Sequence, residues 1–168
     1  RCHTKGFVRE RGEFFFLKKI KNLLNNKNMN IKKSFILGII INLISIGAIY
    51  ITMNKYRKEI SANCIDCSYM QDVLINSISI LLFLLVYVSN KFINNKNIFA
   101  LIVSLYAIIH VFVGQIGIFN SRIGSWSSYS YTDIIIGVFL EQYFNLIMIL
   151  VVFILTIKFW IYKQKLQI

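Results

Sequence analysis

The chain has 168 residues, 57% of them hydrophobic, and it contains no proline. A soluble domain of this length could not bury so much apolar surface, whereas a lipid bilayer solvates it, so we expect an integral membrane protein. Lys and Arg number 19 against 7 Asp and Glu, giving a net charge of +12. These basic residues flank the apolar runs, which indicates cytoplasmic segments next to anionic lipid and argues against a nucleic-acid partner.

The first 33 residues form a basic segment that we expect to be a cytoplasmic tail. Residues 1–28 show no hydrophobic periodicity, and two interpretations stay open. They are either a disordered or surface-lying tail, or the translation of an upstream sequence whose true start is Leu17 or Met29. The abundance of Ile, Asn and Lys is typical of AT-rich bacterial genomes, so the expected location is a bacterial cell membrane.

Four apolar windows are long enough to cross a bilayer, which takes about 20 helical residues. They cover residues 34–53, 73–92, 98–119 and 134–157. Strands are excluded because the runs lack period-two alternation and an open sheet leaves backbone groups unsatisfied in lipid. The sequence therefore predicts an all-α integral membrane protein, a four-transmembrane-helix bundle over residues 34–162, followed by a tail over 163–168.

The distribution of basic residues predicts the orientation of these helices. Fifteen Lys and Arg lie before the first window, around the connection between the second and third, and after the fourth; four lie in the other two connections. Since cytoplasmic segments carry the excess of Lys and Arg, both termini are expected in the cytoplasm. The connections 54–72 and 120–133 are then extracytoplasmic.

The first of these connections contains the run Cys64-Ile65-Asp66-Cys67-Ser68-Tyr69. Two cysteines at this spacing can form a disulfide, which either stabilises the loop or exchanges with other thiols. A metal site is not expected, because the pair supplies two ligands and the extracytoplasmic segments contain no histidine. If Cys67 lies in the first turn of the second helix, the helix dipole lowers its thiol pKa.

Polar residues inside the windows form the second candidate site. His110 in the third window and Glu141 in the fourth lie at similar depths, so we expect both to face the bundle interior and to pair. Gln115 and Asn145 belong to the same candidate ligand or proton pocket. Polar and small residues recur on one face of each window: Gly38, Asn42 and Ser45; Asn76 and Ser79; Ala107, His110, Gly114 and Gly117; Gly137, Glu141 and Asn145. Hydrogen bonding between helices is the alternative role.

The second extracytoplasmic connection is rich in serine and aromatic residues. Trp126, Tyr129 and Tyr131 are expected at the level of the lipid headgroups, with recognition of a partner as the alternative. Asp133 is placed to cap the fourth helix.

In its topology and its first-loop CxxC, the chain resembles the DsbB-type disulfide-forming membrane proteins. Those proteins have four helices, cytoplasmic termini and a CxxC at the start of the second helix. The resemblance implies that Cys64 and Cys67 are the catalytic redox pair, that quinone is the cofactor and that an exported thiol protein is the partner. Two positions differ: Gln71 stands where the family has arginine, and the connection 120–133 lacks the second cysteine pair.

Two functions therefore remain as hypotheses. One is a membrane thiol–disulfide oxidoreductase that uses Cys64 and Cys67, with quinone near His110 and Glu141. The other is a non-enzymatic membrane protein, such as a bacteriocin-immunity or transporter-accessory subunit, that recognises its partner through the two extracytoplasmic connections.

Overall fold

The computed structural model describes residues 31–62 and 66–166. Over these ranges the chain is helical apart from its connections, and it contains no strand. The elements in chain order are α2 (Ile31–Thr52), η1 (Asn54–Tyr56), α3 (Tyr69–Ser77), α4 (Ile80–Phe92), α5 (Lys96–Arg122), η2 (Gly124–Trp126) and α6 (Tyr131–Leu166). The two alternatives for residues 1–28 concern a part of the chain outside the described residues.

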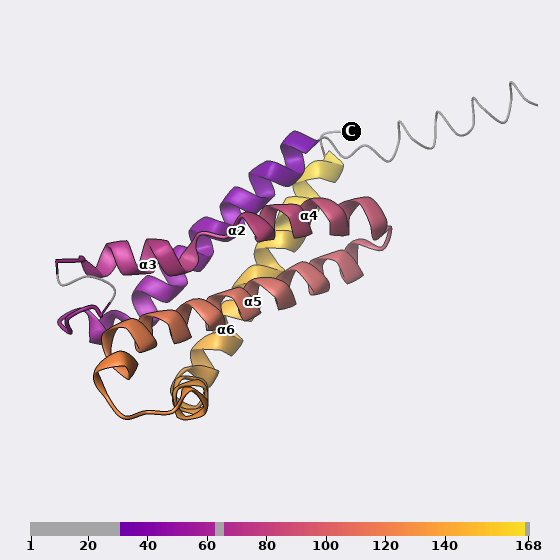
Figure 1. Ribbon diagram of the computed structural model, residues 1–168. Coiled ribbons are helices and arrows are strands. Elements are labelled where there is room, and N and C mark those ends of the chain that lie inside the picture. The colour runs from indigo at the N-terminus through magenta and orange to yellow at the C-terminus, as the bar shows by residue number, and fades with distance from the viewer. Residues whose placement is uncertain (1–30, 63–65, 167–168) are drawn as a thin grey trace, which may run out of the picture.

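The helices form four passes through one bundle, with α3 and α4 following each other in the second pass (Figure 1). All four passes are long and apolar enough to cross a membrane: Ile31–Thr52, Tyr69–Phe92, Lys96–Trp126 and Tyr131–Lys163. The predicted all-helical fold with four apolar windows is therefore confirmed. The start of α2 and the end of α6 lie at one end of the bundle (Figure 1). We call the opposite end, which carries the connections 53–68 and 123–130, the loop end; which side of a membrane it faces stays a prediction.

The core is formed by side chains of all five described α-helices, and α5 is in contact with each of the others. Its fully buried side chains include Leu37, Ile41, Leu82, Val86 and Val111. Large apolar side chains are also exposed on every helix, as expected of a surface that a bilayer covers.

Helices α3 and α5 approach each other closely at two glycines of the predicted small-residue face. A methyl group on Gly114 would meet the side chain of Ile49 and, at 3.1 Å, the backbone oxygen of Asn76. On Gly117 it would collide with the Asn76 side chain. The structure thus confirms that these small residues allow close helix packing.

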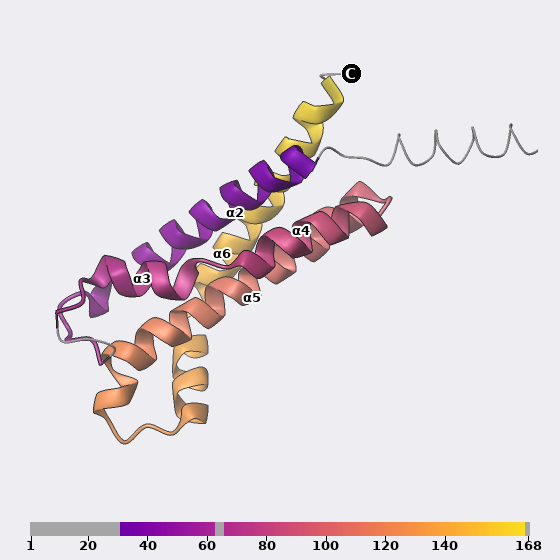
Figure 2. The ribbon, with the colours of Figure 1, turned by 45° about the horizontal axis from the view of Figure 1, so that its top comes forward.

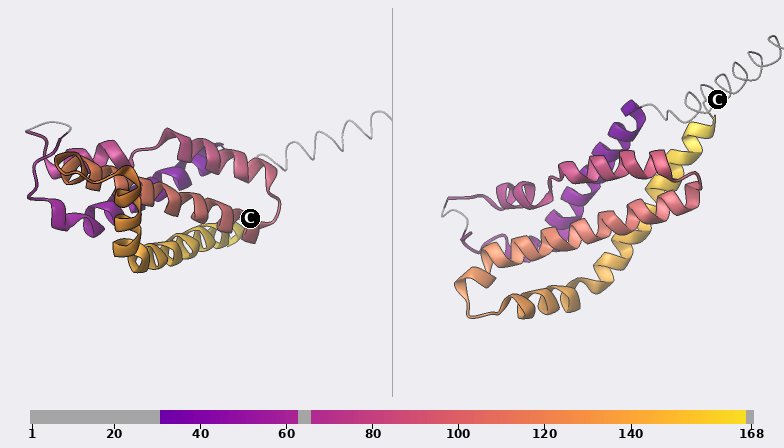
Figure 3. Two further views of the ribbon diagram at one scale, coloured as in Figure 1. Left: turned by 60° about the horizontal axis from the view of Figure 1, so that its bottom comes forward. Right: turned by 45° about the vertical axis from the view of Figure 1, so that its right-hand side comes forward.

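The second pass is one candidate span but not one helix. The backbone is extended at Ile78 (φ −80°, ψ 118°) and Ser79 (φ −129°, ψ 113°), which separates α3 from α4 (Figures 2 and 3). Non-helical backbone at membrane depth needs polar partners from within the protein. Asn42 of α2 supplies one, because its Oδ1 accepts a hydrogen bond from the Ser79 backbone N–H at 3.3 Å.

The face of α6 that points into the bundle differs from the expected polar face by about one residue, so the expectation is wrong. Gly137, Glu141 and Asn145 are exposed, whereas the buried positions at the same level are Ile134, Val138, Gln142 and Leu146. A shift of one residue turns a helix face by about 100°. Since the fourth window is apolar nearly all round, contact with α5 and α2 sets its orientation rather than its own amphipathicity.

Candidate functional site

The loop end is organised around a buried ion pair between α5 and α3. Nη2 of Arg122 lies 2.8 Å from Oδ2 of Asp72, and their side chains are 2% and 0% exposed. Ser61 adds a hydrogen bond from its Oγ to Asp72 Oδ1 at 3.1 Å. The Arg122 guanidinium also lies over the ring of Tyr69, 5.3 Å from its centroid. A charge pair so removed from water persists only where such contacts satisfy both partners.

Arg122 also binds the backbone of the connection that carries the two cysteines. Its Nη1 donates to the carbonyl oxygens of Arg57, at 3.2 Å, and Glu59, and its Nη2 donates to that of Cys67, at 3.4 Å. These carbonyls lie on both sides of the segment 63–65, so one side chain holds the connection both before the CxxC and at its second cysteine.

Two further hydrogen bonds join the first connection to the end of α5 and to the second connection. The Ala62 backbone N–H donates to the Ser121 carbonyl oxygen at 2.6 Å. The indole Nε1 of Trp126 donates to the Ile60 carbonyl oxygen at 3.0 Å. The connections 53–62 and 123–127 therefore form one structural unit.

The first helical turn after the cysteines is capped by side chains. Ser68 Oγ accepts from the Gln71 N–H at 3.3 Å, and Gln71 Oε1 accepts from the Ser68 N–H at 2.7 Å, which is a capping box. The half-buried Cys67 precedes this N-cap. Cys67 therefore lies outside the first turn, because α3 begins at Tyr69, and the condition stated for an effect of the helix dipole on its thiol is not met. Cys64 lies outside the described residues, so the disulfide stays a prediction.

The structure gives His110 and Glu141 different partners instead of pairing them. His110 Nε2 donates to the Ser77 carbonyl oxygen at 2.8 Å, which is freed where α3 ends. Together with Asn42, His110 therefore satisfies the backbone at the break in the second pass. This contact matches the alternative role, hydrogen bonding between helices.

Glu141 lies at the edge of the loop end rather than inside the bundle. It forms an ion pair with Lys55 and accepts a hydrogen bond from the Tyr56 hydroxyl at 2.9 Å. Partial burial of Lys55 opposes its charge, yet the hydrogen bonds to Glu141 and Tyr56 outweigh it and raise the Lys55 pKa. Desolvation, together with Glu141, raises the pKa of Tyr56, so the phenol stays protonated as a donor.

Gln115 and Asn145 do not bring His110 and Glu141 together in one pocket. Gln115 is fully buried and donates from Nε2 to Thr52 Oγ1 at 2.9 Å, whereas Asn145 donates from Nδ2 to Gln142 Oε1 at 2.9 Å. Of the four residues of the predicted ligand or proton pocket, Glu141 and Asn145 are linked through Gln142, whose Nε2 donates to Glu141 Oε1 at 3.1 Å, whereas His110 and Gln115 make separate contacts.

The aromatic residues of the second connection are exposed, at 62% for Trp126, 56% for Tyr129 and 67% for Tyr131. Their place among lipid headgroups stays a prediction. Helix α6 begins with a reciprocal pair in which Ser130 Oγ accepts from the Asp133 N–H, at 3.2 Å, and Asp133 Oδ2 accepts from the Ser130 N–H, at 3.1 Å. Ser130 therefore takes the capping position expected for Asp133.

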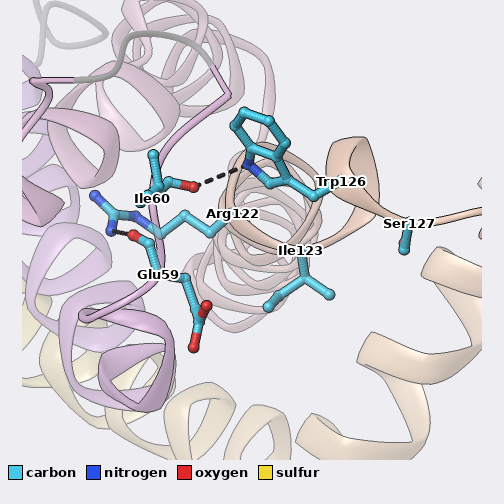
Figure 4. Close-up of a pocket in the computed structure, with 6 residues that line it drawn as sticks. All are labelled: Glu59, Ile60, Arg122, Ile123, Trp126 and Ser127. Atoms are coloured by element: carbon cyan, nitrogen blue, oxygen red, sulfur yellow. Dashed lines mark hydrogen bonds between the residues drawn. The ribbon is translucent and has the colours of Figure 1, made fainter.

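A pocket of about 380 Å³ opens between the two connections (Figure 4). Its lining residues are Glu59, Ile60, Arg122, Ile123, Trp126 and Ser127. A second, apolar groove of about 400 Å³ lies between α5 and α6, around Phe112 and Phe139. The sequence singled out only Trp126 among the residues of the first pocket.

Comparison of the chain with protein-family models, with curated proteins and with solved structures finds no match. The fold nevertheless defines a class: a helical bundle with four helices able to cross a membrane. Its distinctive site is the loop end, where buried charges bind the connection next to the cysteines.

Proposed function

We propose that the protein is a multi-pass bacterial cell-membrane protein that carries out thiol–disulfide exchange through Cys64 and Cys67. The loop end faces the extracytoplasmic side in this proposal, where thiols tend to be oxidised. A partner dithiol is oxidised to a disulfide while the Cys64–Cys67 disulfide is reduced to two thiols. By the resemblance to DsbB-type proteins, the partner is an exported thiol protein, and a quinone, itself reduced to the quinol, restores the disulfide.

The observation that carries this proposal is the anchoring of the connection by Arg122. A disulfide between Cys64 and Cys67 closes a loop of four residues, and such a cross-link contributes only about 2 kcal/mol in the chain-entropy model. It also joins residues of one connection to each other and not to the bundle. Arg122 makes that link to the bundle through the carbonyls of Arg57, Glu59 and Cys67. The pair can therefore open and close while the connection stays in place, as a redox cycle requires.

The proposal is tested by thiol trapping of the full chain in detergent, in a Cys2→Ser background. The oxidised protein is mixed with a reduced peptide that contains a CxxC pair. We expect oxidation of the peptide in step with the appearance of free thiols at Cys64 and Cys67, and its loss in the Cys64→Ser, Cys67→Ser variant. Equal peptide oxidation by that variant would exclude the cysteines as the reacting groups.

A second candidate, recognition of a partner without chemistry, is favoured by the exposed apolar side chains of the joined connections. Trp126 is 62% and Ile60 60% exposed, although their segments are fixed to each other. A bacteriocin-immunity or transporter-accessory subunit would use such a surface. This function predicts that Trp126→Ala abolishes activity in cells, whereas Cys64→Ser with Cys67→Ser preserves it; the thiol function predicts loss of activity in the double serine variant.

A further inference from the structure

The pocket at the loop end has walls that are fixed to each other. One wall is the segment of Glu59 and Ile60, and the other is the segment from Arg122 to Ser127. The hydrogen bond from Trp126 to Ile60 and the bond from Arg122 to the Glu59 carbonyl connect the two walls (Figure 4). A preformed pocket of this kind binds a ligand at a low cost in ordering.

The positive charge of Arg122 is not available to a ligand in this pocket. Its guanidinium is paired with Asp72 and donates to backbone carbonyls, and the residue is 3% exposed. Arg122 therefore forms part of the wall and does not make the pocket attractive to anions.

Of the two charged residues that line the pocket, Glu59 is the one whose charge is available to a ligand. Within residues 31–62 and 66–166, its carboxylate takes part in no ion pair and no side-chain hydrogen bond, and the residue is exposed. The side chain of Ile123, which also lines the pocket, lies on the same side of Arg122 as the carboxylate (Figure 4). An uncompensated carboxylate beside an apolar wall favours a cation with an apolar stem, such as an arginine or lysine side chain.

The Trp126 indole lies on the other side of Arg122 from the Glu59 carboxylate (Figure 4). Its N–H is occupied by the Ile60 carbonyl, so the ring offers an apolar face and no free donor. A ligand that uses the whole pocket must therefore carry a cation and, separated from it, an apolar group. A compact cation such as a choline headgroup meets only the first of these requirements, whereas two neighbouring side chains of a polypeptide meet both.

We propose that this pocket binds a basic side chain of an extracytoplasmic polypeptide, with its cation at Glu59 and an adjacent apolar side chain on Trp126. The inference rests on the proposed function for its partner, since the pocket would then dock the exported thiol protein next to Cys67. The partner would then be selected by a basic side chain with an apolar neighbour.

The test uses the full chain in maltoside detergent. The chain has two tryptophans, and the substitution Trp160→Phe leaves Trp126 as the single fluorescent indole. The probe is a capped Phe-Arg dipeptide, and its control is capped Phe-citrulline, in which the guanidinium is replaced by a neutral group of the same shape. We expect the Arg peptide to change the Trp126 fluorescence in a saturable manner, with an affinity at least tenfold higher than that of the citrulline peptide.

Glu59→Gln should remove this tenfold preference. Asp66→Asn changes the charge of the same connection equally but does not line the pocket, and it should leave the affinity within twofold. Equal binding of the two peptides, or a preference that survives Glu59→Gln, would overturn the inference. A Glu59-dependent response to phosphatidylcholine nanodiscs without a response to the peptide would do the same, because the occupant would be a lipid headgroup.

The Cys64→Ser, Cys67→Ser variant separates this inference from the proposed function. Among the residues that the structure describes, Cys67 does not line the pocket, so we expect peptide binding to persist in this variant. If the wild-type chain binds the Arg peptide but exchanges no thiols, the thiol function is wrong and the pocket assignment stands. Thiol exchange without selective binding would overturn the pocket assignment alone.

Discussion

Arg122 and Asp72 form an ion pair with 2.8 Å between Nη2 and Oδ2, and at 2% and 0% they are the least exposed charged side chains of the loop end. One comes from the end of α5 and the other from the first turn of α3, so the pair connects the third pass to the second. Because each charge is buried, each depends on the other for compensation.

Removal of either charge alone should strongly destabilise the protein. Arg122→Met leaves the Asp72 carboxylate without its cation, and Asp72→Asn leaves the guanidinium without its anion. We expect each to lower the free energy of unfolding by about 3–5 kcal/mol. The measurement is unfolding in mixed detergent micelles, followed by far-ultraviolet circular dichroism.

Two controls accompany this prediction. Arg57→Met removes an exposed cation from the same connection and should change the free energy of unfolding by less than about 0.5 kcal/mol. The double variant Arg122→Met with Asp72→Asn should lose less than the sum of the two single losses, because no lone charge remains buried. Additive losses would show that the two side chains do not act as a pair.

The break in the second pass should depend on its two polar partners. Asn42→Ala leaves the Ser79 N–H without an acceptor, and His110→Ala leaves the Ser77 carbonyl without a donor. Each substitution should lower the free energy of unfolding by about 1–3 kcal/mol, and Asn42→Ala should speed hydrogen exchange at the amide of Ser79. In contrast, Ser45→Ala removes a bond to Ile41 within the same helix and should leave that exchange unchanged. Equal exchange rates in the Asn42 and Ser45 variants would contradict this role of Asn42.

The glycines of the bundle should differ sharply in their tolerance of alanine. A methyl group on Gly117 meets the Asn76 side chain, and one on Gly114 meets Ile49 and the Asn76 backbone. We expect each substitution to lower the free energy of unfolding by about 1–3 kcal/mol through overpacking. Gly47 and Gly137 have no atom within 4 Å of an added Cβ, so alanine there should be neutral or stabilising. Similar losses at all four positions would contradict the close approach of α3 and α5.

The Lys55–Glu141 contact should persist throughout the physiological range of pH. Partial burial opposes the charge of Lys55, but hydrogen bonds to Glu141 and Tyr56 raise its pKa above the ordinary 10.5. Because the folded-state pKa is raised, the contribution of the contact is complete below pH 10.5 and is lost as the pH rises through the folded value. A carbon-13 NMR titration of the Lys55 Cε should show this. Glu141→Gln should lower the pKa of Lys55, whereas Glu59→Gln should not; an unchanged value in the Glu141 variant would contradict the assigned cause.

Hydropathy and length were sufficient to predict the four passes, because about 20 apolar residues have few other stable arrangements. The break at Ile78 and Ser79 was missed since no proline or glycine marks it. The residues that could indicate this break are polar residues within two other apolar windows. Asn42 is expected from the sequence only as part of a polar helix face, and His110 as a partner of Glu141. Only the fold shows that both serve the backbone of the second pass.

The candidate site was predicted less well than the fold. Asp72 and Arg122 belong to two different connections, and no sequence pattern predicts that they pair, although each lies within three residues of the nearest apolar window and thus at a similar depth. His110 and Glu141 were matched by depth alone, which cannot show the direction in which a side chain leaves its helix. In α6 that direction differs from the expected one by about one residue, and Glu141 consequently meets Lys55.

The reduction potential of the Cys64–Cys67 pair tests the central proposal most directly. It is measured on the full chain in lipid nanodiscs, in a Cys2→Ser background, by equilibration with thiol redox buffers and trapping of free thiols. Structural disulfides typically have reduction potentials below about −300 mV and resist reduction by the glutathione pool. A cysteine pair that cycles should have a reduction potential well above that value. A pair that stays oxidised below about −300 mV would be structural, and the proposed thiol exchange would be wrong.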